Sequence, residues 1–468
     1  MLTTIDKQAN SPVRIEESAS EIFERTKARE IRLSRLLVFY ITGGLLFMLL
    51  PGTFLGVWNP VSVSGRRASE SFSPAWIQAH GHAQVLGWIG TFILGIGYYS
   101  IPKLRGGIKP YPVWTAGLVG AMWMSGVLLR WLANVYLWHW RVLLPLSAVM
   151  ELVAFLTFFR AVSQHKPQDS GKAKLDTWVF VVIAGAVGLL AALLFNLGAC
   201  IWLAGSAANP GLPQPLDQRF LVLAAWGFMV PFIWGFSAKW LPIFLGTRSP
   251  SNRWLLATLS GYAGGLLFGV AGLFRTMTGM ILLASLMASV VLRIFVVPER
   301  PAKTGGIHAS FPFFVRSAYV WLIIAASIGV WAANVSDPSG IWGASRHALT
   351  VGFVAMMVFT VGQRVLPAFS GMKMLFSPTL MFAGLLLLSM GCALRVTSEV
   401  LAYQEILPAA WKWLPYSAIL ELCAVTLFAV NLIATFLSEP PSLQALGSKR
   451  VRYVRTNGQH GQPNPLDR

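Results

Sequence analysis

The sequence predicts an all-α integral membrane protein in which twelve transmembrane helices form three four-helix pseudo-repeats. The first observation is composition: 55% of the 468 residues are hydrophobic and only 12% are charged. A soluble domain cannot bury that much apolar surface, so the solvent around this chain is largely lipid. The second observation is the length of the apolar segments, and the third is an internal repeat that groups them in fours.

Twelve apolar segments are long enough to cross a bilayer as helices of about 20 residues. Residues 1–35 before them are polar and are predicted to form a cytoplasmic segment with an amphipathic helix, and residues 438–468 a polar cytoplasmic tail. The predicted spans fall at roughly 36–58, 78–102, 113–136, 140–162, 177–204, 218–244, 254–275, 279–298, 316–335, 346–368, 377–397 and 413–437.

The charge is strongly one-sided, with 37 Lys and Arg against 18 Asp and Glu. In a soluble protein this excess of basic residues would suggest nucleic-acid binding. Here most basic residues lie between apolar segments, on the same side of the bilayer as the N-terminus. This is the pattern of cytoplasmic loops. We therefore predict no nucleic-acid partner, a surrounding of membrane lipid, and a multi-pass protein of the cell inner membrane with both termini in the cytoplasm.

An internal repeat connects the two ends of the chain. The stretch "HGHAQVLGWIGTFILGIGYYSIPKLRG" recurs as "RHALTVGFVAMMVFTVGQRVLPAFSG", so that His82 matches His347 with an offset of 265 residues, from 82 to 347. A weaker copy, 140 residues after the first, has Val222 in place of the histidine. The three predicted units cover about 36–165, 177–300 and 316–437.

Further polar residues repeat in the outer two units. Arg130 in "GVLLR" matches Arg395 in "GCALR", and Glu151 in "PLSAVMEL" matches Glu421 in "PYSAILEL". The middle unit keeps an arginine, Arg275, but has no such glutamate. Repeated glycines and prolines can be explained by helix packing alone, whereas polar residues inside spans are costly and indicate function.

The paired histidines are candidate metal ligands. A lone histidine near a helix end is usually an interfacial residue bonded to a carbonyl, but His82 and His347 are equivalent and both begin helices at the outer leaflet. Two facing imidazoles suit the axial positions of a b-type haem. His80 lies about 200° from His82 around a helix, so the two cannot face one pocket. His80 is therefore predicted to support the site or to bind a second metal such as copper, since imidazole suits both metals.

The repeated arginines and glutamates each have two interpretations. Arg130 and Arg395 are placed to pair with haem propionates, because guanidinium matches carboxylate geometry, or to extend to the outer interface as long basic side chains do. Glu151 and Glu421 lie deeper and either transfer protons or hold the bundle together.

The motifs resemble known families. The helix arrangement resembles subunit I of the haem–copper oxidases. "HGHAQVLG" and "RHALTVG" are similar to the His-x-His-acid and His-Ala-Leu-Thr motifs of the NnrS family, membrane proteins associated with the response to nitric oxide. The chain departs from that family at Gln84, where an acidic residue is expected. A proton or metal role that the family assigns to this position therefore does not carry over to this chain by the resemblance alone. The resemblance implies haem and copper as bound cofactors. It also implies nitric oxide or another small gaseous ligand as the partner, and a role in tolerating nitric oxide or nitrosative stress.

Three functions remain open from the sequence: a haem protein of the nitric oxide response, a haem-dependent oxidoreductase of the oxidase or nitric oxide reductase type with an unidentified electron donor, and a transporter. Three units do not match the paired inverted repeats common in transporters. In the oxidases the copper ligands come from helices 6 and 7, whereas this chain has no histidine between Lys166 and Ile307. We therefore predict that it does not reduce oxygen by that mechanism.

Overall fold

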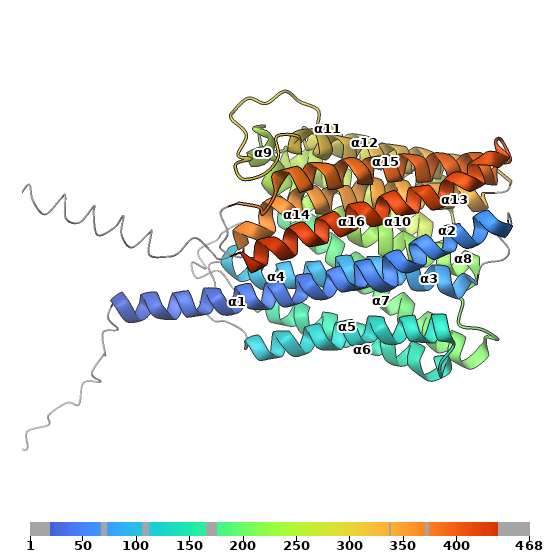
Figure 1. Cartoon of the computed structure of the whole chain (residues 1–468), viewed down its shortest axis with the longest axis horizontal. Coiled ribbons are helices and arrows are strands. Elements are labelled where there is room, and N and C mark those ends of the chain that lie inside the picture. The colour runs from blue at the N-terminus through green and yellow to red at the C-terminus, as the bar shows by residue number, and fades with distance from the viewer. Residues whose placement is uncertain are drawn as a thin grey trace, which may run out of the picture.

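The computed structural model describes residues 19–66, 73–104, 112–164, 176–336, 338–369 and 374–438, and helices are the only regular elements in these ranges (Figure 1). The segments η1, η3, η4 and η5 are π-helical and η6 is a 3₁₀ helix. In chain order the elements are α1 (Ala19–Phe47), η1 (Met48–Thr53), α2 (Phe54–Arg66), α3 (Pro74–His82), η3 (Ala83–Gly90), α4 (Thr91–Leu104), α5 (Val113–Tyr136), α6 (Trp140–Ser163), α7 (Thr177–Ser206), α8 (Gln214–Leu221), η4 (Val222–Met229), α9 (Val230–Leu245), α10 (Asn252–Val270), α11 (Phe274–Val291), α12 (Phe311–Ala332), α13 (Ser339–His347), η5 (Ala348–Ala355), α14 (Met356–Phe369), α15 (Pro378–Tyr403), η6 (Pro408–Lys412) and α16 (Trp413–Leu437).

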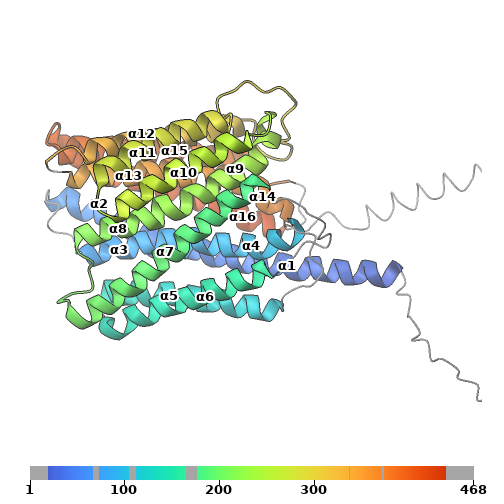
Figure 2. The ribbon, with the colours of Figure 1, turned by 180° about the vertical axis from the view of Figure 1, so that it is seen from behind.

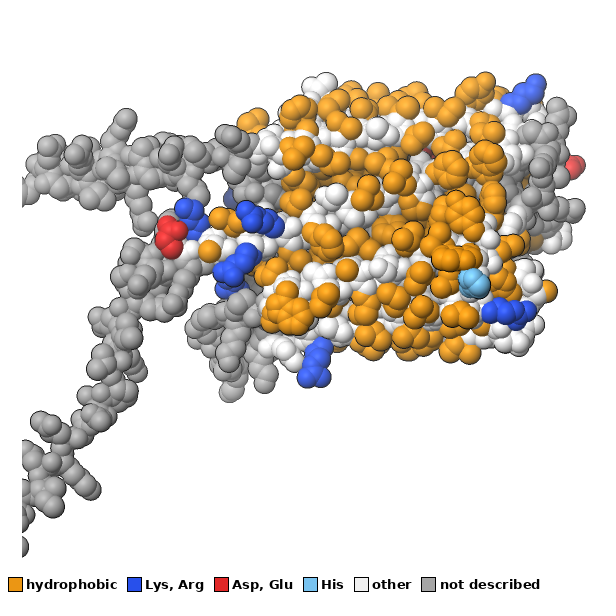
Figure 3. Space-filling view, turned by 60° about the horizontal axis from the view of Figure 1, so that its bottom comes forward, with side chains coloured by type: hydrophobic (Ala, Val, Ile, Leu, Met, Phe, Trp, Pro, Cys, Tyr) orange, Lys and Arg blue, Asp and Glu red, His pale blue; other side chains and the backbone are white. Residues whose placement is uncertain are grey.

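Most of these helices are suited to a bilayer. Within the described ranges, 11 helical stretches are long and apolar enough to cross a membrane. Hydrophobic side chains cover the flank of the bundle, while Lys and Arg gather toward its ends (Figure 3). The chain is therefore a multi-pass helical membrane protein. Helix α10 occupies the position of the seventh predicted span but is not one of the 11, so the count of twelve stays a prediction.

The structure displaces the boundary between the seventh and eighth predicted spans. The sequence suggested spans at 254–275 and 279–298, but the structure ends the first helix at Val270 and begins α11 at Phe274. The turn passes through Gly272 with φ of +87°, a left-handed conformation that glycine adopts without a side-chain clash. Arg275, predicted to end the earlier helix, therefore lies in the first turn of α11, where it is exposed.

The helices lie side by side in one bundle (Figures 1 and 2). Helix α1 begins beyond one end of it, and the short helices α2, α3, α8 and α13 lie at the opposite end. The predicted N-terminal amphipathic helix is continuous with the first span from Ala19 onward. Residues 1–18 of that segment, and residues 439–468 of the predicted tail, lie outside the described residues.

Three π-helical segments occupy corresponding places in the three predicted units. Each follows directly on a short helix: η3 on α3, η4 on α8 and η5 on α13. Helix α7 packs so closely against η4 that a Cβ atom at Gly188 would clash with the carbonyl oxygen of Gly227. A π-helix hydrogen-bonds from i to i+5, is rare, and is found frequently at functional sites.

Candidate functional site

A cavity of about 230 Å³ lies between the three π-helical segments, toward the end of the bundle that carries α3, α8 and α13. Helices α5, α7, α15 and α16 complete its walls. A largely apolar pocket with a few convergent polar groups is the usual form of a small-molecule or cofactor site. The polar and charged side chains that line it are Thr53, Gln78, His80, His82, Gln84, Arg130, Asn196, Asp217, Arg346, His347, Thr350, Arg395 and Glu421.

His80 is held through one ring nitrogen. Its Nδ1 lies 2.7 Å from the carbonyl oxygen of Gly52 in η1. Because a carbonyl oxygen only accepts, this contact requires a proton on Nδ1, and in the neutral ring Nε2 then carries the lone pair. The ring lines the cavity, and no described residue hydrogen-bonds its Nε2.

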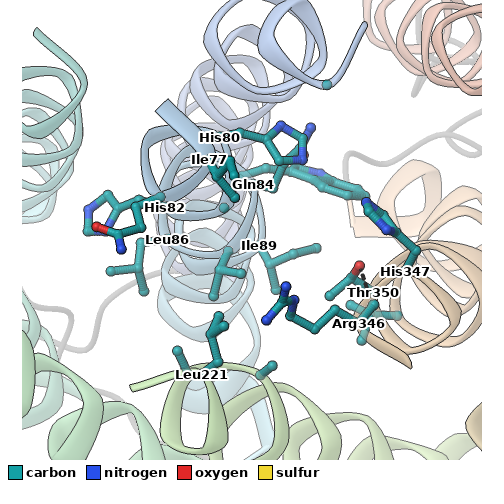
Figure 4. Close-up of a pocket in the computed structure, with 18 of the residues that line it drawn as sticks. Ile77, His80, His82, Gln84, Leu86, Ile89, Leu221, Arg346, His347 and Thr350 are labelled. Carbon is teal, nitrogen blue, oxygen red and sulfur yellow. Dashed lines mark hydrogen bonds between the residues drawn. The ribbon is translucent and has the colours of Figure 1, made fainter. Parts of the chain in front are cut away.

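His347 is held in the same way from the opposite part of the chain. Its Nδ1 lies 2.9 Å from the carboxylate of Glu399 on α15, and no described residue hydrogen-bonds its Nε2. His80 and His347 are close enough to interact electrostatically, and they lie on the same side of the cavity (Figure 4). An imidazole that donates Nδ1–H to a carbonyl or carboxylate and keeps Nε2 free is the arrangement of metal-bound histidines.

His82 has a different environment. Its Nε2 lies 2.7 Å from Oε1 of Glu151 on α6, and the two side chains are only 2% and 0% exposed. Its Nδ1 is buried without a partner among the described residues. Figure 4 shows His82 on the far side of the cavity from His347.

The structure thus differs from the predicted pairing of His82 with His347. Side chains at positions i and i+2 of a helix point about 200° apart. Only one of His80 and His82 can therefore face His347. The repeat register selected His82, but the packing of α3 turns His82 toward α6 and brings His80 to the side of His347.

The predicted arginines both line the cavity. Arg130 donates from Nη1 to Oδ1 of Asn196 at 2.6 Å and to Sγ of Cys200 at 2.8 Å, both on α7. Asn196 also reaches Oε2 of Glu151 at 3.5 Å. Arg130 is therefore held by neutral groups and is connected to the pair of Glu151 and His82 through an amide.

Arg395 has a carboxylate partner. Its Nη2 lies 3.7 Å from Oε2 of Glu421 and donates to the carbonyl of Gly56 at 3.3 Å. The two repeated glutamates have different partners, a histidine for Glu151 and an arginine for Glu421.

Two site residues were missed by the sequence reasoning. Glu399 lies beyond the predicted end of its span at 397, whereas α15 continues to Tyr403. Its position four residues after Arg395, on the same helix face, was the available signal. Arg346 was passed over although it precedes His347 directly; its guanidinium extends into the cavity and donates to Oε1 of Gln218 at 3.3 Å.

Gln84 and His139 lie outside the contacts described so far. The amide of Gln84 is directed to the carbonyl of Met48 at 3.5 Å and to Oγ1 of Thr53 at 3.4 Å. His139 is exposed in the turn before α6, with φ of +39°, and does not line the cavity. Within the described ranges, no three His, Cys, Asp or Glu side chains group as a site for a metal ion.

These features define a class: a multi-pass helical membrane protein with an imidazole-lined central cavity. A solved structure reported as "Cryo-EM structure of a heme-copper terminal oxidase dimer provides insights into its catalytic mechanism" is similar to it, with a TM-score of 0.56 and 13% identity over 88% of this chain and 85% of that chain. At this identity the similarity shows the fold alone.

The family follows from the sequence. The profile described as NnrS protein matches residues 37–440, so the chain belongs to the NnrS family. This confirms the resemblance found in the "HGHAQVLG" and "RHALTVG" motifs. No curated protein matches the chain.

Proposed function

We propose that this protein binds a b-type haem in the central cavity and acts in the response to nitric oxide. Family membership supports the role, and the similarity in fold to a heme-copper terminal oxidase supports a haem-related membrane protein. The observation that carries the proposal is the pair of imidazoles, His80 and His347, each anchored through Nδ1 with Nε2 left for a metal.

The cavity residues fit such a group. Haem iron is commonly held by imidazole nitrogen, and His80 and His347 would supply two such ligands. The guanidinium groups that line the same cavity are the proposed partners of the propionates, since arginine forms paired hydrogen bonds with carboxylates. We therefore replace the predicted pairing of His82 and His347 with His80 and His347, and assign His82 to the buried contact with Glu151.

The two ligands differ in strength. A carboxylate behind an imidazole makes the ring a stronger donor than a backbone carbonyl does. His347, which is hydrogen-bonded to Glu399, would thus bind the haem iron more strongly. His80, which is hydrogen-bonded to the carbonyl of Gly52, would dissociate from the iron more readily. When bound, the haem supplies an iron atom that binds a small gaseous ligand such as nitric oxide.

Further parts of the proposal rest on the sequence. They are the twelve-helix count, the three four-helix units, the inner-membrane location and cytoplasmic termini. The π-helical segments at corresponding places support the three units. Copper as a second cofactor rests on the resemblance, with His80 no longer its proposed ligand, and the electron donor is left open.

The fold favours one alternative, a haem-dependent oxidoreductase related to the oxidases or to nitric oxide reductase. The lack of histidine between Lys166 and Ile307 argues against an oxidase-type copper site. Rapid oxygen consumption by the purified protein with a quinol or cytochrome donor would favour this alternative over the proposed role.

The test is a reduced-minus-oxidised spectrum of the purified protein, with haem and copper quantified. His80→Ala and His347→Ala should each lose the low-spin haem spectrum, while His82→Ala and the exposed control His139→Ala should keep it. Loss in His82→Ala with retention in His80→Ala would restore the pairing predicted from the repeat. A wild-type protein without haem would overturn the proposal and leave the transporter.

A further inference from the structure

Two arginines that line the cavity have no carboxylate partner in the part of the chain that the structure describes. There, the side chain of Arg130 is 4% exposed and bonds only Asn196 and Cys200, while the side chain of Arg346 is half-buried and bonds only Gln218. Among the described residues, no Asp or Glu oxygen lies within 4.0 Å of either guanidinium. Buried charges in proteins are normally paired, because an isolated charge away from water is costly.

Other arginines of the chain have the carboxylate partner that Arg130 and Arg346 lack among the described residues. Arg395 in the same cavity is paired with Glu421 at 3.7 Å, and on the surface Arg293 is paired with Glu299 at 3.1 Å. Arg130 and Arg346 come from different units, on α5 and α13, yet their side chains line one space. Figure 4 shows the guanidinium of Arg346 in the middle of that space.

Asp217 on α8 is a negative charge near both arginines. It lines the cavity and is close enough to interact electrostatically with both Arg346 and Arg130, but it forms an ion pair with neither. Glu399 also interacts electrostatically with Arg346, but it is hydrogen-bonded to His347, and Glu151 is bonded to His82. No described carboxylate therefore accepts a hydrogen bond from either guanidinium, and Nε of Arg130 is buried without a partner among the described residues. An oxyanion in the cavity would accept these N–H groups.

We propose that Arg130 and Arg346 form a binding site for one planar oxyanion in the cavity, on the side of α8. Guanidinium recognises planar oxyanions through two parallel N–H···O bonds, which a lysine cannot reproduce. The Nη1 atom of Arg130 already donates to Asn196 and Cys200, so its contact comes from the remaining N–H groups, and Arg346 offers its fork from α13.

Two sources share this chemistry: a free anion such as nitrite, and a propionate carboxylate of the haem. Only the second source rests on the proposed haem function. The two can be separated by comparing the protein with and without haem.

The experiment titrates sodium nitrite by calorimetry into the purified full-length protein, both as isolated with haem and after expression under haem limitation. The haem-free wild type should bind one nitrite per chain. Arg346→Gln should weaken binding roughly tenfold to hundredfold, as expected for the loss of a charge-assisted bidentate contact. Arg346→Lys, which keeps the charge, should fall between them and also guards against misfolding. Arg275→Gln, an exposed arginine of the middle unit, should match the wild type.

Binding to both forms identifies a free oxyanion. Binding to the haem-free form alone, with faster haem loss from Arg346→Gln, identifies the propionate. The site is refuted if the haem-free wild type shows no saturable binding and Arg346→Gln retains haem normally, or if Arg346→Gln binds nitrite as tightly as wild type. Nitrite binding by a protein that never holds haem would support this site while overturning the haem proposal.

Discussion

The N-terminal and C-terminal units of the chain carry the same polar residue types but pair them differently. In the N-terminal unit, His82 is bonded to Glu151 and Arg130 is left to the neutral partners Asn196 and Cys200. In the C-terminal unit the glutamate that matches Glu151 is Glu421, and it forms an ion pair with Arg395 at 3.7 Å.

The cause lies one helical turn beyond the arginines. Glu399 follows Arg395 by four residues and anchors His347, while the corresponding residue after Arg130 is the neutral Asn134, whose Nδ2 donates to the carbonyl of Ala75 at 3.2 Å. At this repeated position, α15 therefore offers a carboxylate to His347, whereas α5 offers only the amide of Asn134. The comparison teaches that a repeated histidine keeps its position but takes its orientation from the nearest acceptor.

Replacing Glu399 by the residue of the N-terminal unit tests this comparison most strongly. In Glu399→Asn, His347 loses the carboxylate that orients its ring, and supporting residues of this kind are typically worth about 10–100-fold in metal affinity. We expect a haem affinity lower by that factor, measured by haem transfer to apomyoglobin. Asn134→Ala, the matched change in the N-terminal unit, should leave haem affinity unchanged. Equal losses in both variants would show that the two units do not differ.

The two matching glutamates should differ in their contribution to stability. Glu151→Leu leaves His82 buried with neither ring nitrogen bonded to a described residue, which should cost about 2 kcal/mol of unfolding free energy. Glu421→Leu should cost about 1 kcal/mol, because Arg395 keeps the carbonyl of Gly56 and the nearby charge of Glu399. Unfolding in mixed micelles measures both values. A larger loss in Glu421→Leu would contradict the assignment of partners.

The two buried cysteines extend the comparison to smaller effects. Cys200 accepts from Arg130 at 2.8 Å, whereas Cys392 makes only a long contact of 3.9 Å with the carbonyl of His347. Both lose similar volume on change to alanine, so Cys200→Ala should be less stable than Cys392→Ala by about 1 kcal/mol, the value of one hydrogen bond. Thermal unfolding in one detergent would detect the difference, and equal stabilities would show that the contact to Arg130 contributes nothing.

The smallest effect is expected in the middle unit. Arg275 is the repeat counterpart of Arg130 and Arg395, but it is exposed, and its one acceptor among the described residues is the carbonyl of Ala333 at 3.2 Å. Arg275→Gln should change the unfolding free energy by less than about 0.5 kcal/mol, as surface substitutions usually do. A loss comparable to that of the buried sites would mean that the middle unit retains a role that its exposed arginine does not suggest.

The sequence by itself determined the class of protein, the order of its helices and the helices that carry the site. Apolar segments of bilayer length admit only helices as single spans, since lipid cannot hydrogen-bond exposed backbone. The cost of polar residues in such segments singled out the histidines, arginines and glutamates. Only the tertiary structure decided that His80 rather than His82 lies on the side of His347, that Glu399 anchors His347, and that Arg346 joins Arg130 in the cavity. These contacts depend on how each helix is rotated about its axis, and that rotation is set by neighbours distant in sequence, such as η1 for His80 and α6 for His82.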